Sequence, residues 1–341
     1  MYFNSNANRR PPFSTTRPAA LAGLLLAATW LPTLPAKAQC FDDNLAKVVA
    51  GSSLINDHMG EAVAVHGDVA VLGSPDDEEG GFMNAGSVSV FRRDPGTGQW
   101  TEEQRVVAGD PSGSAFFGRS VDIYGDTLIV GNTEHSPAGI ATGAAYIFRY
   151  DGVSWNEEQK LTLAAPDPGD RFGFSVGIWG DTAVVGADSR DVGFEDDAGS
   201  AYVYEFNGLA WISVATLVAP DALEDAFLGH SIAIHDNWII AGAWADNANF
   251  LDGGAAYIFS DQGAGWAYFQ KIISNNLTED DLFGTAVDIH GDRAIVGAQF
   301  HDTLGQNRGA AYIFEIGMLG AGWLQVAEVT ASDVEPFDRF G

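Results

Sequence analysis

Acidic side chains in loops are the residues of this chain best suited to chemistry. Asp188 and Asp191 are followed closely by Glu195, Asp196 and Asp197. Hard cations such as Ca²⁺ are held by several carboxylate and carbonyl oxygens on a short flexible loop. This segment is therefore the first candidate for a Ca²⁺ site, and the alternative is that its carboxylates are simply solvated. The further candidate ligands are Asp76, Asp77, Asp246 and Asp252.

Histidine is the other residue type that could supply a base or a metal ligand. His66, His235 and His290 occupy one repeat position, where Tyr124 and Trp179 stand in the other copies. Replacement by large aromatic residues indicates packing rather than catalysis. The loop histidines, which are His58, His135 and His301, have no neighbouring serine or cysteine that would suggest a nucleophile with its base. The sequence therefore predicts that the protein is not an enzyme.

These residues are placed by a repeat of roughly 55 residues. Each unit opens on Phe-Gly or a variant of it, continues through an apolar stretch ending in Val-Gly or a variant, and closes on a tryptophan. The opening pairs are Met59–Gly60, Phe117–Gly118, Phe172–Gly173, Leu228–Gly229, Phe283–Gly284 and Phe340–Gly341. The tryptophans, which we expect to pack between units, are Trp100, Trp155, Trp211, Trp266 and Trp323.

The pattern within one unit predicts four antiparallel strands. In the second copy we expect strands at 120–124, 127–130, 144–148 and 155–161, with Gly125–Asp126 as a two-residue turn between the first two. The middle strands are nearly all apolar, as in a sheet covered on both faces. The last is polar, as at an exposed edge. Four-stranded units at this period indicate the blades of an all-β propeller rather than a solenoid or a sandwich.

In such a meander, the loops between the second and third strands lie on the same rim as the loops between units. Both loop classes are rich in carboxylates, and they contain every candidate Ca²⁺ ligand named above. Loops at one rim are also where a scaffold of this kind usually carries its binding residues. We therefore expect a protein or glycan partner to bind at this acidic rim.

Charge and the N-terminal segment limit the partners and the location. The chain has 46 acidic and 17 basic residues, which excludes nucleic acid and an anionic membrane surface as partners. Residues 1–38 have the pattern of a signal peptide, with arginines before an apolar run and Ala36–Lys37–Ala38 as a cleavage site. The run from Ala19 to Leu31 is shorter than the roughly 20 residues of a spanning helix. We expect a secreted or periplasmic protein with no membrane insertion after leader cleavage. Cys40 is the single cysteine, so no intramolecular disulfide can form.

The Phe-Gly opening, the Val-Gly segment and their spacing resemble the FG-GAP repeats of the integrin α-subunit propeller and its bacterial relatives, over residues 51–341. The resemblance implies a propeller, and it does not fix an activity. Integrin-type repeats that bind calcium carry a D-x-D-x-D-G loop between the first two strands, whereas this chain has only the Gly-Asp turn there. Four turn residues are therefore not carried over as calcium ligands: Asp68, Asp126, Asp181 and Asp292.

The predicted organisation is a leader at 1–38 and one propeller at 39–341. Complete blades are expected at about 52–107, 108–162, 163–218, 219–273 and 274–329, and residues 330–341 begin a sixth. A segment at 47–51 resembles the fourth strand at 105–109, so it reads as an isolated fourth strand. This pattern favours an incomplete six- or seven-bladed ring, and the alternative is a five-bladed ring with ragged ends.

The sequence thus favours a non-catalytic binding or adhesion module that uses one acidic rim, with Ca²⁺ as a candidate cofactor. Two alternatives stay open. One is a propeller hydrolase with a site near the central channel, and the other is a truncated remnant of a longer surface protein.

Overall fold

The computed structural model describes residues 48, 50–51, 57–136, 141–247, 250–302, 307–317, 320–333 and 337–341. All of these residues belong to one compact unit, Ala46–Gly341. The predicted leader and Cys40 lie outside the described residues, as do Lys47 and Val49 of the segment at 47–51 that was expected to form an isolated strand. Within the described ranges, no helix is long and apolar enough to cross a membrane.

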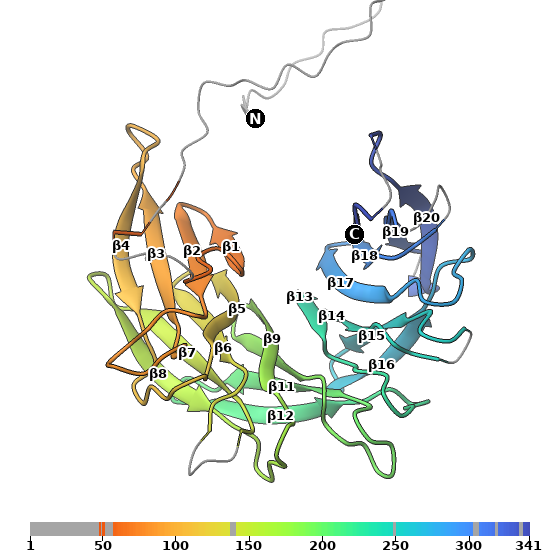
Figure 1. Ribbon diagram of the computed structural model, residues 1–341, viewed down its shortest axis with the longest axis horizontal. Coiled ribbons are helices and arrows are strands. Elements are labelled where there is room, and N and C mark those ends of the chain that lie inside the picture. Colours follow the sequence, from red (N-terminus) through yellow and green to blue (C-terminus); the bar gives the residue numbers. More distant parts are fainter. Residues whose placement is uncertain are drawn as a thin grey trace, which may run out of the picture. The chain divides into compact units, whose positions relative to one another are not determined.

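In the described part of the chain, twenty strands form five sheets, and each sheet is an antiparallel meander of four consecutive strands (Figure 1). Sheet 1 contains β1 (Val63–His66), β2 (Val69–Ser74), β3 (Ser87–Arg93) and β4 (Trp100–Val106). Sheet 2 contains β5 (Phe117–Tyr124), β6 (Thr127–Asn132), β7 (Ala144–Tyr150) and β8 (Trp155–Leu161). Sheet 3 contains β9 (Phe172–Trp179), β10 (Thr182–Ala187), β11 (Ser200–Phe206) and β12 (Trp211–Leu217). Sheet 4 contains β13 (Ser231–His235), β14 (Trp238–Ala243), β15 (Ala255–Asp261) and β16 (Trp266–Ile272). Sheet 5 contains β17 (Phe283–His290), β18 (Arg293–Ala298), β19 (Ala310–Ile316) and β20 (Trp323–Val329). The predicted all-β class and the five four-stranded units are confirmed.

The hairpin between the first two strands of each sheet has the predicted form. Tyr124 pairs directly with Thr127, which leaves Gly125 and Asp126 as the turn. The first turn residue needs a positive φ, and Gly125 has φ 58°. In sheet 4, where no glycine is present, Asp236 takes the same conformation with φ 54°. The Gly-Asp pairs are therefore structural residues of a tight turn.

Apolar side chains form four cores, one between each pair of consecutive sheets. Between sheets 1 and 2, Val71 and Val90 of sheet 1 pack with Val121 and Ile123, which belong to β5 of sheet 2. Because the middle strands of a sheet lie between two such cores, side chains on both of their faces are buried, as in all six residues of β6. The nearly continuous apolar runs of the sequence follow from this stacking.

The Phe-Gly and Val-Gly motifs meet at these interfaces. Phe172 is fully buried and begins β9 beside Gly143 of the preceding sheet, with which it forms a parallel bridge. Gly173 then lies so close to Gly131 of β6 that a Cβ on Gly131 would overlap the carbonyl oxygen of Gly173. The equivalent contacts join Gly73 with Gly118, Gly186 with Gly229 and Gly242 with Gly284. The two motifs therefore recur together because each supplies one side of the same backbone contact.

Replacing Gly242 by alanine tests this contact. We expect Gly242→Ala to lower the free energy of unfolding by on the order of 3 kcal/mol, because the new methyl group would overlap backbone that cannot rotate away. Urea denaturation followed by far-UV circular dichroism measures the loss. Gly113→Ala is the matched control, since its Cβ would meet nothing closer than the Met83 carbonyl at 3.6 Å. Equal effects of the two substitutions would contradict the assignment.

Candidate functional site

The two acidic loop classes lie on one rim, as the meander predicted. The loop that leads into each new sheet runs beside the loop between the second and third strands of the preceding sheet. Asp225 donates its backbone N–H to the Asp196 carbonyl at 2.9 Å, and Phe227 donates to Asp197 at 3.1 Å. The same pairing recurs where Ser114 donates to Met83 and where Asp280 donates to Leu251. Consecutive sheets therefore share a continuous rim of interlocked loops.

One repeat position on this rim carries a charged or titratable side chain in every sheet. The position lies three residues after the second strand and is occupied by Asp77, His135, Arg190, Asp246 and His301. Four of these side chains are buried, and Arg190 is partly buried. Burying a charge is costly unless it is paired. A partner of suitable charge should therefore accompany each of them.

Sheet 4 shows the pairing most fully. The Lys271 ammonium lies 2.8 Å from the buried Asp246 carboxylate and 2.9 Å from Asp221. The Tyr257 hydroxyl lies within hydrogen-bond distance of the same two carboxylates, 2.6 Å from Asp246 and 2.8 Å from Asp221, and they share its single proton. Burial opposes ionisation of Asp221, but the hydrogen bonds from Lys271 and Tyr257 outweigh it and lower the pKa of Asp221. Asp246, a predicted Ca²⁺ ligand, is thus joined to a lysine.

The other sheets pair the same position with different residues. In sheet 1, Asp77 binds the Arg105 guanidinium and accepts a hydrogen bond from Ser87 at 2.6 Å. In sheet 2, His135 lies 2.6 Å from Lys160, which also binds Asp110 at 2.7 Å. Burial and the Lys160 charge lower the pKa of His135. In sheets 3 and 5 the pairs are Arg190 with Asp167 at 2.8 Å and Asp170 at 2.7 Å, and His301 with Asp281 at 2.9 Å.

The segment expected to be the best Ca²⁺ candidate divides into two parts. Asp188 is fully buried and lies 3.3 Å from the Arg171 guanidinium and 3.0 Å from the His230 ring. Asp191 instead accepts a hydrogen bond from the backbone of Asp197 at 3.0 Å. Asp196 is exposed. The sequence placed all of these in one site, whereas the structure gives Asp188 a basic environment of its own.

The second part of that segment is a cluster of carboxylates around Asp197. Burial raises the pKa of Asp197, and the neighbouring charges of Asp191, Asp225, Asp188 and Asp196 raise it further. Among the residues that the structure describes, no lysine or arginine pairs with Asp191, Asp196, Asp197 or Asp225. Oxygen ligands that repel one another are the donor set that Ca²⁺ neutralises. Among the described residues, however, the ligand atoms that converge within 4.8 Å of one another belong to His58, Glu61 and Asp76 and not to this cluster. The repulsion would attract a cation, and a Ca²⁺ ion held by Asp191, Asp196 and Asp197 stays a prediction.

The remaining candidates are separated from this cluster. Asp76 contacts the His58 ring, and one ligand atom each from His58, Glu61 and Asp76 fall within 4.8 Å of one another. Glu61 also binds the Arg119 guanidinium, which competes with a cation for its carboxylate. Asp252 is held by its backbone N–H, which donates to Asn247 at 2.6 Å.

The first strands of all five sheets line a cavity of about 560 Å³. At one end of these strands, one ring from each sheet packs against the next in a tilted or edge-on orientation. The ring centroids of His66 and Tyr124 are 4.8 Å apart, those of Tyr124 and Trp179 4.7 Å, those of Trp179 and His235 3.9 Å, and those of His235 and His290 4.1 Å. The prediction that the histidines at this position are packing residues is confirmed.

Polar side chains in this channel also hold the inner strands together. His66 accepts a hydrogen bond from the backbone of Gly125 in the next sheet at 3.1 Å, and His235 accepts one from Gly291 at 3.3 Å. Asp122 accepts from its neighbour Ile123 and from Ile178 of sheet 3, each at 2.8 Å. These groups satisfy the backbone donors of exposed sheet edges. They are therefore engaged in structural contacts between sheets.

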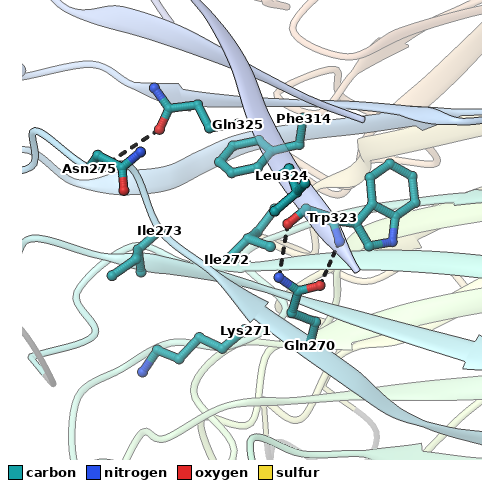
Figure 2. Close-up of a pocket in the computed structure, with 9 residues that line it drawn as sticks. All are labelled: Gln270, Lys271, Ile272, Ile273, Asn275, Phe314, Trp323, Leu324 and Gln325. Carbon is teal, nitrogen blue, oxygen red and sulfur yellow. Dashed lines mark hydrogen bonds between the residues drawn. The ribbon is translucent and has the colours of Figure 1, made fainter. Parts of the chain in front are cut away.

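A second pocket, of about 420 Å³, lies on the outer side, between β16 and β20 (Figure 2). Figure 2 shows the Gln270 side chain bonded to both backbone groups of Trp323, at 2.9 Å to its oxygen and 2.6 Å from its nitrogen. Gln104 and Gln159 join Trp155 and Trp211 in the same way. Trp155, Trp211 and Trp323 are buried, which confirms the packing role predicted for them. The polar groups of this pocket thus connect neighbouring outer strands.

Five four-stranded blades with interlocked loops at one rim define a β-propeller-type repeat protein. The FG-GAP repeat model matches residues 43–91, 100–148, 155–204, 211–259 and 266–314. The chain belongs to the FG-GAP repeat family. A comparison with curated proteins found no match.

The sequence analysis named some of these five rim residues singly but did not predict that they share one repeat position and pair with charged partners, although a signal for it was present. In the strand register, Lys160 lies opposite Tyr146, and Lys271 lies opposite Tyr257. The basic residue of the polar outer strand and the tyrosine of the third strand recur at fixed spacing. Reading that pair together with the loop position would have predicted the ion pairs.

Replacing Lys271 tests the charge pairing on the rim. We expect Lys271→Met to lower the free energy of unfolding by about 3 kcal/mol, because Asp246 stays buried without its counter-charge. Thermal and urea denaturation measure the change. Arg293→Met serves as a control, because the Arg293–Glu315 pair is exposed and should contribute less than about 1 kcal/mol. A Lys271→Met protein as stable as the control would contradict the pairing.

Asp122 makes a prediction about pH. Burial raises the pKa of this carboxyl to about 6, against the hydrogen bonds from Ile178 and Ile123, and the Asp288 charge adds to the rise. The folded protein therefore binds this proton more tightly than the unfolded chain. The resulting stability is fully present below about pH 4 and is lost as pH rises towards 6.

We expect Asp122→Asn to remove this pH dependence, on the order of 1–2 kcal/mol between the two limits for a side chain still partly exposed to water. Urea denaturation across this pH range gives the slope. Asp181→Asn, in the exposed turn of sheet 3, removes the same charge and should leave the slope unchanged. An unaltered slope in Asp122→Asn would exclude the assigned titration.

Proposed function

We propose that this protein is a non-catalytic FG-GAP propeller of the cell exterior or periplasm that binds a protein or glycan partner through its acidic rim, in adhesion or surface assembly. The observation that carries this proposal is the rim itself. Loops from consecutive sheets interlock there by backbone hydrogen bonds, so their side chains are held in fixed relative positions. Preorganised loops lose less conformational freedom when they bind a partner.

The electrostatics of the rim indicate what it would bind. Most buried carboxylates of the rim are paired with basic residues, as Asp246 is with Lys271. The cluster of Asp191, Asp196, Asp197 and Asp225 is different, because its charges repel one another and raise the pKa of Asp197. A cation relieves this repulsion. The cluster therefore favours either a basic group of a protein partner or a Ca²⁺ ion that bridges to the hydroxyl or carboxylate oxygens of a glycan.

The hydrolase alternative is less well supported by the channel. Three histidines and two aspartates line it. However, His66 and His235 each accept a backbone hydrogen bond at Nδ1, and both oxygens of Asp122 accept one, so these groups are already engaged in contacts between and within the sheets. Screening the protein against esterase, phosphatase and glycosidase substrates separates the two functions. If the protein turns over one of these substrates and Asp122→Asn abolishes the turnover, the protein is a hydrolase and the proposed non-catalytic binding function is wrong.

The Ca²⁺ component is tested by a calorimetric titration of the chain with CaCl₂. We expect heat of binding and a rise in Tm, and both should be lost in the variant Asp191→Asn/Asp196→Asn/Asp197→Asn. The matched control is Glu279→Gln/Asp280→Asn/Asp302→Asn, which removes three charges from exposed rim positions elsewhere. If the natural chain gives neither heat of binding nor a Tm shift, the proposal that the rim binds Ca²⁺ is wrong.

Partner binding is tested with the same variants on a glycan array and on immobilised basic peptides, with Ca²⁺ or with a chelator. We expect binding by the natural chain and the control variant and at least a tenfold loss in the cluster variant. Equal binding by all three proteins would show that the acidic cluster does not recognise the partner.

A further inference from the structure

The face of sheet 5 that points away from sheet 4 is apolar and uncovered. In Figure 1, sheet 4 lies on one side of sheet 5, and no described strand lies on the other. Ile295 of β18 is 41 % exposed, and Val329 of β20 is 37 % exposed. Ile313 of β19, between them, is partly buried. These three side chains form what we call the trailing face of sheet 5.

The same repeat positions are buried in every other sheet. The residues equivalent to Ile295 are Val71, Ile129, Val184 and Ile240, and each is 0 % exposed. The residues equivalent to Val329 are Val106, Leu161, Leu217 and Ile272, at 2 or 3 %. In sheets 1 to 4 these positions belong to the core shared with the following sheet. The trailing face of sheet 5 is therefore one complete half of an interface that the molecule builds four times.

The polar groups on β17, the inner strand of sheet 5, match those that bind the following sheet elsewhere in the molecule. Asp288 stands at the position of Asp122, whose carboxylate receives a backbone N–H from the following sheet at 2.8 Å. His290 stands at the position of His66 and His235, which accept the N–H of the next turn glycine. Both Asp288 and His290 are exposed. The acceptors for a following first strand are thus already in place.

Phe340 and Gly341, where a following first strand would begin, make the same contacts as the Phe-Gly pairs that begin the first strands of the other sheets. Phe340 forms a parallel bridge with Gly309 and donates its N–H to the Arg308 carbonyl at 2.9 Å. Phe283 and Gly254 form the same bridge one sheet earlier. Gly341 then lies against Gly297 as Gly284 lies against Gly242. Phe340 itself is only partly buried, whereas Phe283 is fully buried.

We propose that the trailing face of sheet 5 is a docking site for a sixth four-stranded sheet of the same repeat, entered through Phe340 and Gly341. Its first strand would place two β-branched apolar residues, equivalent to Val287 and Ile289, on Ile295, Ile313 and Val329. Its backbone N–H groups would be received by Asp288 and His290. A surface built from repeat positions that otherwise bury a neighbouring sheet fits this partner better than an unrelated protein.

The test appends a further copy of residues 285–341 directly after Gly341, so that Phe340–Gly341 opens the added unit in register. In a Cys40→Ser background, Ile295→Cys supplies a single thiol on the trailing face. We expect the added unit to slow its reaction with a soluble maleimide at least tenfold. The reference for a covered position is Ile240→Cys in the unextended chain. Because Ile295 is exposed, its replacement should not disturb folding.

The control extension carries Val287→Asp and Ile289→Asp in the appended copy only, and its thiol should stay as reactive as in the unextended chain. Equal reactivity with and without the natural extension would overturn the proposal. Protection of the thiol in the unextended chain that grows with protein concentration, with a dimer by light scattering, would also overturn it, because a second copy would then cover the face.

Discussion

The close approach of two glycines across each sheet interface is the contact on which the rest of the molecule depends. Gly131 and Gly173 meet backbone to backbone, and no side chain could be inserted between them. This contact sets how near the first strand of one sheet lies to the second strand of the sheet before it. The apolar residues around it, such as Val121 against Val71, can then interlock at the density of a protein core. Spacing, core packing and the bridging hydrogen bond of Phe172 with Thr142 thus follow from one backbone constraint.

Charge compensation on the rim is the second organising feature, and it explains how so acidic a chain can bury ionised groups. At a single repeat position the molecule uses aspartate, histidine or arginine, and the partner changes with it. Asp246 is met by a lysine, whereas Arg190 is met by two aspartates. The cluster around Asp197 departs from this rule, because its neighbours are other carboxylates. That departure distinguishes it from the paired carboxylates that merely support the loops.

The sequence predicted the sheets well because their signals are local and repeated five times. The fourth strand was placed at 155–161, as β8 has it, and the turn at Gly125–Asp126 was correct. The first strand was placed too short, since β5 begins at Phe117 and continues past a register shift before Val121. The site was harder, because ion pairing joins residues far apart in sequence, such as Arg171 with Asp188 and His230 with Asp188. The backbone before each Phe-Gly was also unforeseen. Phe116, Phe227 and Leu282 all have positive φ although none is a type that favours it.

The boundaries of the sequence repeat and of the sheet do not coincide. The match at 100–148 begins with β4 of sheet 1 and ends within β7 of sheet 2, and the later matches are offset in the same way. Each of these sequence repeats therefore contains the fourth, outer strand of one blade and the first three strands of the next blade. If a whole unit were duplicated or deleted during evolution, every pair of neighbouring blades would still be linked by one continuous segment of chain. The gene could thus gain or lose blades one at a time without passing through an unjoined intermediate.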